Sequence, residues 1–211
     1  MPGAACMTPN PNLTYEKEIW SSYKKIAGLD EAGRGALAGP VCVGAVILPH
    51  NHPRLLRALS GVNDSKQLTP RQRSELAPTI QKTAIAHGVG FASAEEIDQL
   101  GIVPATRLAA SRALEALHMF PEFLLTDFRL ELPELDLPQT AIVKGDARSL
   151  SIACASILAK TARDTLMLEL GNEFPEYKFA SHKGYGTALH RQTILKHGHS
   201  PVHRKTFQIK K

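Results

Sequence analysis

The chain has 211 residues, 43% of them hydrophobic, which is enough to bury one sizeable core as a single domain with at most a small appendage. Its three cysteines, Cys6, Cys42 and Cys154, are far apart and odd in number, which excludes a disulfide framework or a C-x-x-C zinc site and leads us to expect a cytoplasmic protein. The N-terminus has no basic start and no apolar segment, and the longest apolar run, 41–48, is too short to cross a bilayer, so we expect neither secretion nor a membrane span.

Charge is distributed unevenly along the chain. The formal net charge is +5, but the segment 177–211 holds 8 of the 25 Lys and Arg residues, 5 of the 9 histidines and none of the 20 acidic residues. This asymmetry is typical of a nucleic-acid contact surface beside an acidic, cation-binding centre. A solvated basic tail would give the same pattern, so charge alone leaves both interpretations open.

The N-terminal quarter of the chain predicts two strands joined by an irregular loop. We expect residues 1–15 to be disordered and 15–23 to form one helix. Strands are predicted over the apolar segments 26–29 and 41–48, whereas 33–40 contains too much glycine and proline for regular structure.

Asp30 and Glu31 directly follow the first predicted strand. Adjacent side chains of a strand point to opposite faces, so these acids can face one site only if the chain leaves the strand here, toward a turn at Gly33. Arg34 lies between Gly33 and Gly35, which lack side chains, so another backbone can come close while the guanidinium reaches a phosphate. The stretch therefore suits a polyanionic ligand.

The sequence GRGALA also satisfies the dinucleotide-binding pattern G-x-G-x-x-G/A. That pattern must open a helix. Pro40 and the β-type run that follows it would stop such a helix within about two turns. We therefore disfavour a dinucleotide site.

The middle of the chain predicts a scaffold with one candidate anion site. Thr69 as N-cap and Pro70 as first helical residue predict a helix over 70–82. The N-terminus of a helix attracts anions, and a polar turn with Ser65 and Lys66 lies just before it. The scaffold elements that we expect next are a strand over 83–92 and helices over 95–100 and 102–118.

Two later strands also lead to acids. The apolar run 123–127 ends in Asp127, and a short strand over 140–143 leads to Asp146, before a helix over 147–170. Carboxylates at strand ends meet at one edge of an α/β sheet, where ligands bind. Together with the two acids of the first strand they would repel one another unless hard cations such as Mg²⁺ or Mn²⁺ lay between them.

Two of the acids have simpler explanations. Asp146 could be an N-terminal helix charge, which the helix dipole favours. Asp164 could pair with Lys160 and Arg163 on its own helix. Tyr185, which precedes a predicted helix over 188–196, could stack on a sugar or base, or pack into the core.

Several of these stretches resemble the signature motifs of ribonuclease HII, the type 2 ribonuclease H family. The string that begins at Asp30, DEAGRGALAGPV, resembles the family's DEAGRGxLAGPV, and the similarity extends from about residue 25 to residue 207. Further matching strings are DSKQL, KGDARSLSIACASILAKTARD, HKGYGT and PVHRKTF, the last with Thr206 where the family has Ser. One departure is Phe128, where the family usually has Gly after the acid.

The order of elements predicts an α/β domain with a mixed sheet, and the resemblance implies the ribonuclease H-like fold, a mixed β-sheet flanked by helices. It also implies an endoribonuclease that hydrolyses the RNA strand of RNA/DNA hybrids and incises at ribonucleotides embedded in duplex DNA, as in ribonucleotide excision during replication and repair. Two Mg²⁺ or Mn²⁺ ions would act in catalysis and leave 5′-phosphate and 3′-hydroxyl ends. The implied catalytic and metal-binding residues are Asp30, Glu31, Asp127 and Asp146. The implied substrate-binding residues are Gly33, Arg34, Gly35, Asp64, Ser65, Lys66, Lys183 and Tyr185.

We expect a catalytic domain over 16–176, with the basic helical segment 177–211 packed on it, and a monomer. The main alternative is a nucleic-acid-binding module without catalytic activity. Four converging acids would be a liability near phosphates in such a module. Metal-independent binding without cleavage would favour it.

Overall fold

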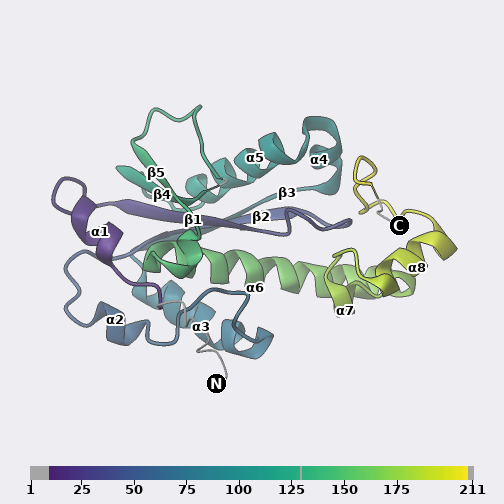
Figure 1. The fold of residues 1–211 in the computed structure, drawn as a ribbon, viewed down its shortest axis with the longest axis horizontal. Coiled ribbons are helices and arrows are strands. Elements are labelled where there is room, and N and C mark those ends of the chain that lie inside the picture. The colour runs from purple at the N-terminus through teal and green to yellow at the C-terminus, as the bar shows by residue number, and fades with distance from the viewer. Residues whose placement is uncertain (1–9, 129, 209–211) are drawn as a thin grey trace, which may run out of the picture.

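The computed structural model describes residues 10–128 and 130–208, which form a mixed sheet between two layers of helices (Figure 1). The strand order is β3-β2-β1-β4-β5; β1 is antiparallel to β2 and parallel to β4. The strands are β1 Ile26–Ala32, β2 Val41–Ile47, β3 Ala86–Ala92, β4 Phe123–Asp127 and β5 Gln139–Ile142. The mixed α/β sheet expected from the sequence is confirmed.

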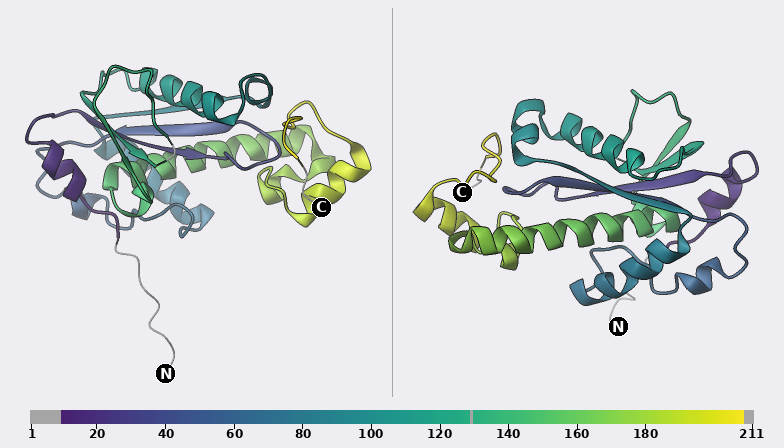
Figure 2. Two further views of the ribbon diagram at one scale, coloured as in Figure 1. Left: turned by 45° about the horizontal axis from the view of Figure 1, so that its top comes forward. Right: turned by 180° about the vertical axis from the view of Figure 1, so that it is seen from behind.

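Helices cover both faces of the sheet. The long helix α6, Leu150–Glu173, lies along one face against β1 and β2, and α3, Pro70–Thr83, lies on its far side (Figures 1 and 2). The opposite face is covered by α5, Ile102–Glu115, with α4, Ala94–Leu100, next to it. Within the described part of the chain, no helix is long and apolar enough to cross a membrane.

Small residues bring α6 close to the sheet. A Cβ atom on Gly28 of β1 would lie 2.4 Å from the backbone of Ser151, and one on Gly44 of β2 would lie 2.3 Å from the carbonyl oxygen of Ala155. Only glycine leaves room for the helix at these two points. Asp30 lies on the same face of β1 as Gly28, so its carboxylate meets α6 at the side chain of Ser156.

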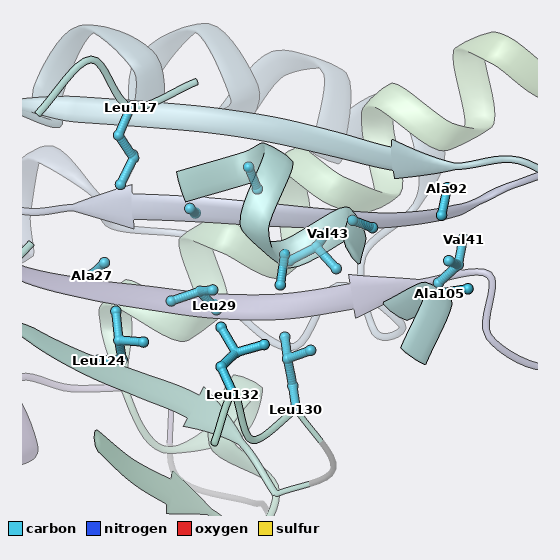
Figure 3. Packing of buried hydrophobic residues seen from close by; sticks show 14 of the residues in the cluster. Ala27, Leu29, Val41, Val43, Ala92, Ala105, Leu117, Leu124, Leu130 and Leu132 are labelled. Atoms are coloured by element: carbon cyan, nitrogen blue, oxygen red, sulfur yellow. The ribbon is translucent and has the colours of Figure 1, made fainter. Parts of the chain in front are cut away.

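The largest buried apolar cluster lies between the sheet and α5 (Figure 3). Ala27 and Leu29 of β1 and Leu124 of β4 point into it, and Leu130 and Leu132 from the loop after β4 close it. These two leucines anchor the chain just beyond the acid that ends β4. A second apolar cluster joins the other face of the sheet to α6 and α3.

Shorter elements complete the described chain: α1 Thr14–Ile19, α2 Leu55–Ala58, the 3-10 turns η1 Gly145–Ala147 and η2 Pro175–Tyr177, α7 Phe179–His182 and α8 Ala188–His197. The sequence did not predict η2 and α7. They form around the stacked rings of Tyr177 and Phe179, whose centroids lie 5.5 Å apart and which are both buried.

The disorder expected over 1–15 can be compared only over 10–15, because 1–9 lie outside the described residues. Over 10–15 the expectation is wrong. Leu13 is buried, and the N–H of Asn12 donates to the carbonyl of Arg148 at 3.2 Å. The chain is therefore held against the start of α6 before α1 begins.

Other boundaries differ by a few residues. β1 continues three residues further than expected, because its ladder with β2 continues to the pair Ala32 and Cys42. β3 begins at Ala86, since α3 runs on to Thr83. The helix expected from residue 147 begins at Leu150, after the turn η1.

Candidate active site

Three carboxylates converge at the ends of two neighbouring parallel strands. Asp30 and Glu31 of β1 and Asp127 of β4 each offer an oxygen atom, and these atoms lie within 4.8 Å of one another. The pairing of Leu29 with Thr126 explains this, because it brings the next residues, Asp30 and Asp127, to the same level of the sheet. The predicted meeting of acids at one sheet edge is confirmed for these three.

The expectation that the chain must leave the strand at the acids is wrong. Asp30 and Glu31 remain in the ladder, opposite Gly44 and Val43 of β2. Asp30 Oδ1 accepts a hydrogen bond from the backbone N–H of Glu31 at 2.8 Å, which turns the carboxylate along the strand toward its neighbour. The rotation of a side chain, rather than a turn of the backbone, therefore brings the two acids together.

Asp146 lies in η1 next to this cluster. Its carboxylate is not one of the three whose oxygens lie within 4.8 Å of one another. The preceding residue joins the two parts of the site, because the N–H of Gly145 donates to Asp127 Oδ1 at 2.7 Å. Asp146 Oδ2 forms an ion pair with Lys66 Nζ at 2.9 Å. Its charge is close enough to help raise the pKa values of Asp30 and Asp127.

Asp146 is not the acid that stabilises the N-terminus of α6. Ser149 caps that helix, its Oγ accepting the N–H of Ile152 at 3.3 Å. The buried carboxylate of Glu16 in α1 accepts the N–H of Ser151 at 2.9 Å. Because the first turn of α6 already has these partners, the simpler explanation of Asp146 as a helix charge loses its support.

Burial and mutual repulsion make the three carboxyl groups hard to ionise. Burial raises the pKa of Asp30 well above its ordinary value, and the charges of Glu31, Asp127 and Asp146 raise it further, against a hydrogen bond from Ser156. Burial also raises the pKa values of Glu31 and Asp127. Such a site favours protonation or a bound cation.

The donor set fits a hard divalent cation. Glu31 Oε2 is buried and has no hydrogen-bond partner among the described residues, although Arg34 lies 3.7 Å from Oε1. A buried carboxylate oxygen without a partner is costly. All candidate ligands are carboxylate oxygens, which Mg²⁺ and Mn²⁺ prefer. A cation between them would satisfy the unpaired oxygen and reverse the repulsion.

A cleft of about 210 Å³ lies beside the carboxylates. It brings together most of the substrate-binding residues expected from the sequence: Gly33, Arg34, Gly35, Ser65, Lys66 and Tyr185. Ser65 is fixed by a hydrogen bond of 2.8 Å between its Oγ and that of Ser156. A larger and mainly apolar cavity of about 460 Å³, near Phe91 and Leu166, is lined by Glu95 and Glu96. Among the described residues the only group of three close carboxylates is that of Asp30, Glu31 and Asp127, so chemistry places the site in the smaller cleft.

Two expected substrate residues do not line this cleft. Asp64 accepts the N–H of Lys66 at 2.9 Å and so shapes the turn before α3. The ammonium of Lys183 donates to the carbonyl of Ala180 and borders a separate small cavity with Asp164. Their contact with substrate stays a prediction.

Asp164 pairs with Lys160 at 2.6 Å, as expected, and with Arg73 at 3.0 Å. The expected pairing of Asp164 with Arg163 is wrong, because the Arg163 guanidinium donates to the carbonyls of Ala38 and Pro40. The distant partner, Arg73 of α3, lies 91 positions away in the sequence, which no local pattern indicates.

Sequence reasoning missed the cations beneath Tyr185. Lys160 Nζ lies 5.4 Å and Arg163 Cζ lies 5.2 Å from the centre of the tyrosine ring, so the half-buried ring is held by cation–π contacts. Phe128, the departure from the family motif, is 56% exposed. Its N–H still donates to the carbonyl of Ile142 at 3.1 Å, so the end of β4 keeps its pairing.

Comparisons with known proteins identify a matching family and a shared fold. The ribonuclease HII family model matches residues 27–210. A ribonuclease HII of Dehalococcoides mccartyi is 53% identical over 209 residues, 98% of this chain and 95% of that protein. The crystal structure of ribonuclease H2 from Pyrococcus horikoshii has a TM-score of 0.72 at 27% identity, covering 88% of this chain and 94% of that one. That of Bst-RNase HIII in complex with Mn²⁺ has a TM-score of 0.65 at 20% identity, covering 87% and 67%.

Proposed function

The chain belongs to the ribonuclease HII family, and from that premise we propose which of its residues carry out the family's reaction. The family cleaves the RNA strand of RNA/DNA hybrids and cuts at ribonucleotides in DNA. This chain is accordingly a metal-dependent endoribonuclease with a ribonuclease H fold.

We propose that Asp30, Glu31, Asp127 and Asp146 hold two divalent cations, Mg²⁺ or Mn²⁺. When bound, these ions supply an activated water and stabilise the leaving 3′-oxygen, so that the products carry 5′-phosphate and 3′-hydroxyl ends. The observation that supports this most strongly is Glu31 Oε2, a buried carboxylate oxygen that lacks a partner among the described residues and lies beside two other acids.

The basic residues of the cleft prepare it for a phosphate. Lys66 pairs with Asp146 at 2.9 Å and offsets the negative charge of the cluster when no substrate is present. Burial works against its ammonium form, but the Asp146 carboxylate outweighs burial and raises the pKa of Lys66, so the side chain stays charged. Ser65, whose Oγ lies 2.8 Å from that of Ser156, also lines the cleft. We propose that both contact the substrate backbone, as do the more distant Asp64 and Lys183.

The turn Gly33-Arg34-Gly35 and Tyr185 would distinguish ribose from deoxyribose. Phosphates and cations are the same on either sugar, so only the 2′-hydroxyl can be read. Both elements line the cleft beside the carboxylates. Backbone groups of the turn can reach the sugar because the glycines leave space, and Tyr185 can stack on the ribose or offer its hydroxyl.

We propose that residues 16–176 form the catalytic domain and that 177–211 pack on it. An isolated bridge between Ala38 and His203 and the packing of Phe207 against the main apolar cluster support this arrangement. A cytoplasmic location remains our proposal, supported by free and buried Cys42 and Cys154. That the protein is a monomer also remains a proposal.

Three matched duplexes test the proposed function: one with a single ribonucleotide, one all-DNA, and one RNA/DNA hybrid. We expect cleavage of the first and third in Mg²⁺, none with a chelator, and recovery when Mg²⁺ is restored. Binding to all three without cleavage in any metal would support a non-catalytic binding module instead.

A further inference from the structure

Two arginines are fully buried beside the cleft without an acidic partner. Arg163 of α6 is 0% exposed and Arg204 is 1% exposed. Among the described residues neither forms an ion pair. Burial lowers the pKa of Arg204 to about 9, which still leaves the guanidinium charged at neutral pH. Buried charges are rarely kept without a pairing role, so what these two bind is informative.

Both guanidiniums donate their hydrogen bonds to backbone carbonyls. Arg204 holds the carbonyls of Gly33 and Arg34, each at 2.8 Å, and that of Gly39 at 3.0 Å. Arg163 holds the carbonyls of Pro40 at 2.9 Å, Lys183 at 3.0 Å and Ala38 at 3.2 Å. The two side chains therefore fix both ends of the loop 33–40, which carries the ribose-reading turn.

The hold on Gly33 and Arg34 has a directional consequence. In a trans peptide the C=O and the next residue's N–H point in opposite directions, and the described residues contain no cis peptide. Since Arg204 draws both carbonyls toward the interior, the N–H groups of Arg34 and Gly35 point the other way. Both residues line the cleft, whereas Arg204 does not.

The same unit includes the segment that presents Tyr185. The carbonyl of Gly184 accepts the N–H groups of Leu37 at 2.8 Å and Ala38 at 3.3 Å. A Cβ atom on Gly184 would lie 2.3 Å from the carbonyl oxygen of Ala38, so the two segments touch backbone to backbone. A displacement of the loop 33–40 would therefore move Tyr185 as well.

We propose that Arg204 and Arg163 are positioning residues for ribose recognition, which hold the peptide groups of the loop so that the N–H groups of Arg34 and Gly35 face the sugar next to the scissile phosphate. This inference rests on the proposed function, because it assigns the support of the turn that would read the 2′-hydroxyl. Neither arginine touches the substrate. Each planar guanidinium donates from separate nitrogen atoms and so fixes the directions of several carbonyls at once. Lysine carries all its donors on one nitrogen and cannot reproduce this arrangement.

The test compares Arg204→Lys and Arg204→Gln with wild type and with Arg112→Lys. Arg112 is a control for the arginine-to-lysine change itself, because it also donates to a backbone carbonyl, that of Phe91 at 2.7 Å, but it pairs with Glu96 and lies outside the cleft. The readout is the ratio of affinities for the one-ribonucleotide and all-DNA duplexes, measured in Ca²⁺ with the duplex checked to be intact. This ratio does not depend on the folded fraction. Cleavage at saturating substrate in Mg²⁺ gives kcat.

We expect Arg204→Lys to lower the affinity ratio about tenfold, the loss of one to two net hydrogen bonds. Misplacement of the scissile phosphate should lower kcat on the order of 100-fold. Arg112→Lys should leave both unchanged. A wild-type ratio near one would refute the proposed reading of the ribose by the turn, and absence of cleavage in Mg²⁺ would refute the proposed function itself. A preserved ratio and kcat in Arg204→Lys would overturn only the positioning role.

If neither Arg204 variant folds, Gly35→Ala tests the premise of the positioning role, that the N–H groups of the turn face the sugar. A Cβ atom on Gly35 meets no atom within 4 Å, so this change does not disturb the fold. The added methyl group would stand beside the N–H that we aim at the sugar, and the affinity ratio should fall. An unchanged ratio would show that the sugar does not approach this turn.

Discussion

Replacing Asp127 by Asn should make the metal-free protein more stable while abolishing cleavage. Asn keeps the shape of the side chain. Its Oδ1 can still accept the hydrogen bond that the N–H of Gly145 donates to Asp127 Oδ1 at 2.7 Å in the wild-type protein. What disappears is one negative charge in a cluster whose oxygens lie within 4.8 Å. The variant should therefore fold normally, lose affinity for the cation, and retain substrate binding.

The size of the stabilisation follows from this spacing. Two unit charges 4.8 Å apart repel by ~3 kcal/mol at an effective dielectric constant of about 20. Because the cleft is open to water and the raised pKa values already favour protonation, we take about half of this, ~1.5 kcal/mol. For a chain of this size that corresponds to a rise in Tm of about 3–6 °C.

Thermal unfolding in a chelator and in Mg²⁺ measures the effect. At high Mg²⁺ the order should reverse, because a cation at about 100 times its Kd stabilises wild type by ~2.7 kcal/mol and the variant, which binds it weakly, by much less. Asp136→Asn is the matched control, since Asp136 is exposed and lies outside the cluster. The Tm of this variant should equal that of wild type in both solutions. A variant that is less stable than wild type in chelator, or that cleaves at nearly the wild-type rate, would refute the reasoning.

Three further predictions concern substrate contacts and pH. Tyr185→Ala should lower cleavage at a single embedded ribonucleotide on the order of 100-fold with little loss of duplex affinity; equal loss of affinity for ribonucleotide and all-DNA duplexes, with normal cleavage at saturation, would make it a generic contact. Replacing Lys183, Arg191 and Lys196 together should reduce the slope of log affinity against log salt by about 0.9 for each phosphate that the variant no longer neutralises; an unchanged slope would leave the basic segment as a solvated surface. Because burial raises the folded-state pKa of Asp30, that residue contributes stability at low pH that is lost as pH rises through the folded pKa. In chelator the free energy of unfolding of wild type, relative to Asp30→Asn, should therefore fall as the pH rises above 3.8, the ordinary pKa of an aspartate; a constant difference would contradict the raised pKa.

The sequence predicted the parts of the site that depend on local order. Asp127 ends an apolar run, which placed it at a strand end, and the parallel pairing of β4 with β1 then brings it beside Asp30. Thr69 as N-cap and Pro70 as first helical residue predicted the start of α3, and hence the turn before it that carries Lys66.

Features that depend on side-chain orientation or on distant contacts could not be predicted. Asp30 and Glu31 meet through a side-chain to backbone hydrogen bond inside a regular strand, which residue alternation alone excludes. Arg204 donates to the carbonyl of Arg34, which lies 170 positions earlier in the sequence. The excess of basic residues in the segment 177–211 predicted that Arg204 lies on a basic surface, but its side chain is buried. A cation that is buried among carbonyls looks the same in the sequence as one that is exposed to phosphate.

The central claim, that the acidic cluster holds cations in contact with the scissile phosphate, is tested most directly by sulfur substitution at that phosphate. Sulfur is a poor ligand for Mg²⁺, and Mn²⁺ accepts it better. On a one-ribonucleotide duplex with a phosphorothioate at the cleavage site, we predict slow cleavage of at least one diastereomer in Mg²⁺ and recovery of its rate in Mn²⁺. Equal slowing in both metals, or no slowing in Mg²⁺ for either diastereomer, would contradict direct contact between the bound cations and the reacting phosphate.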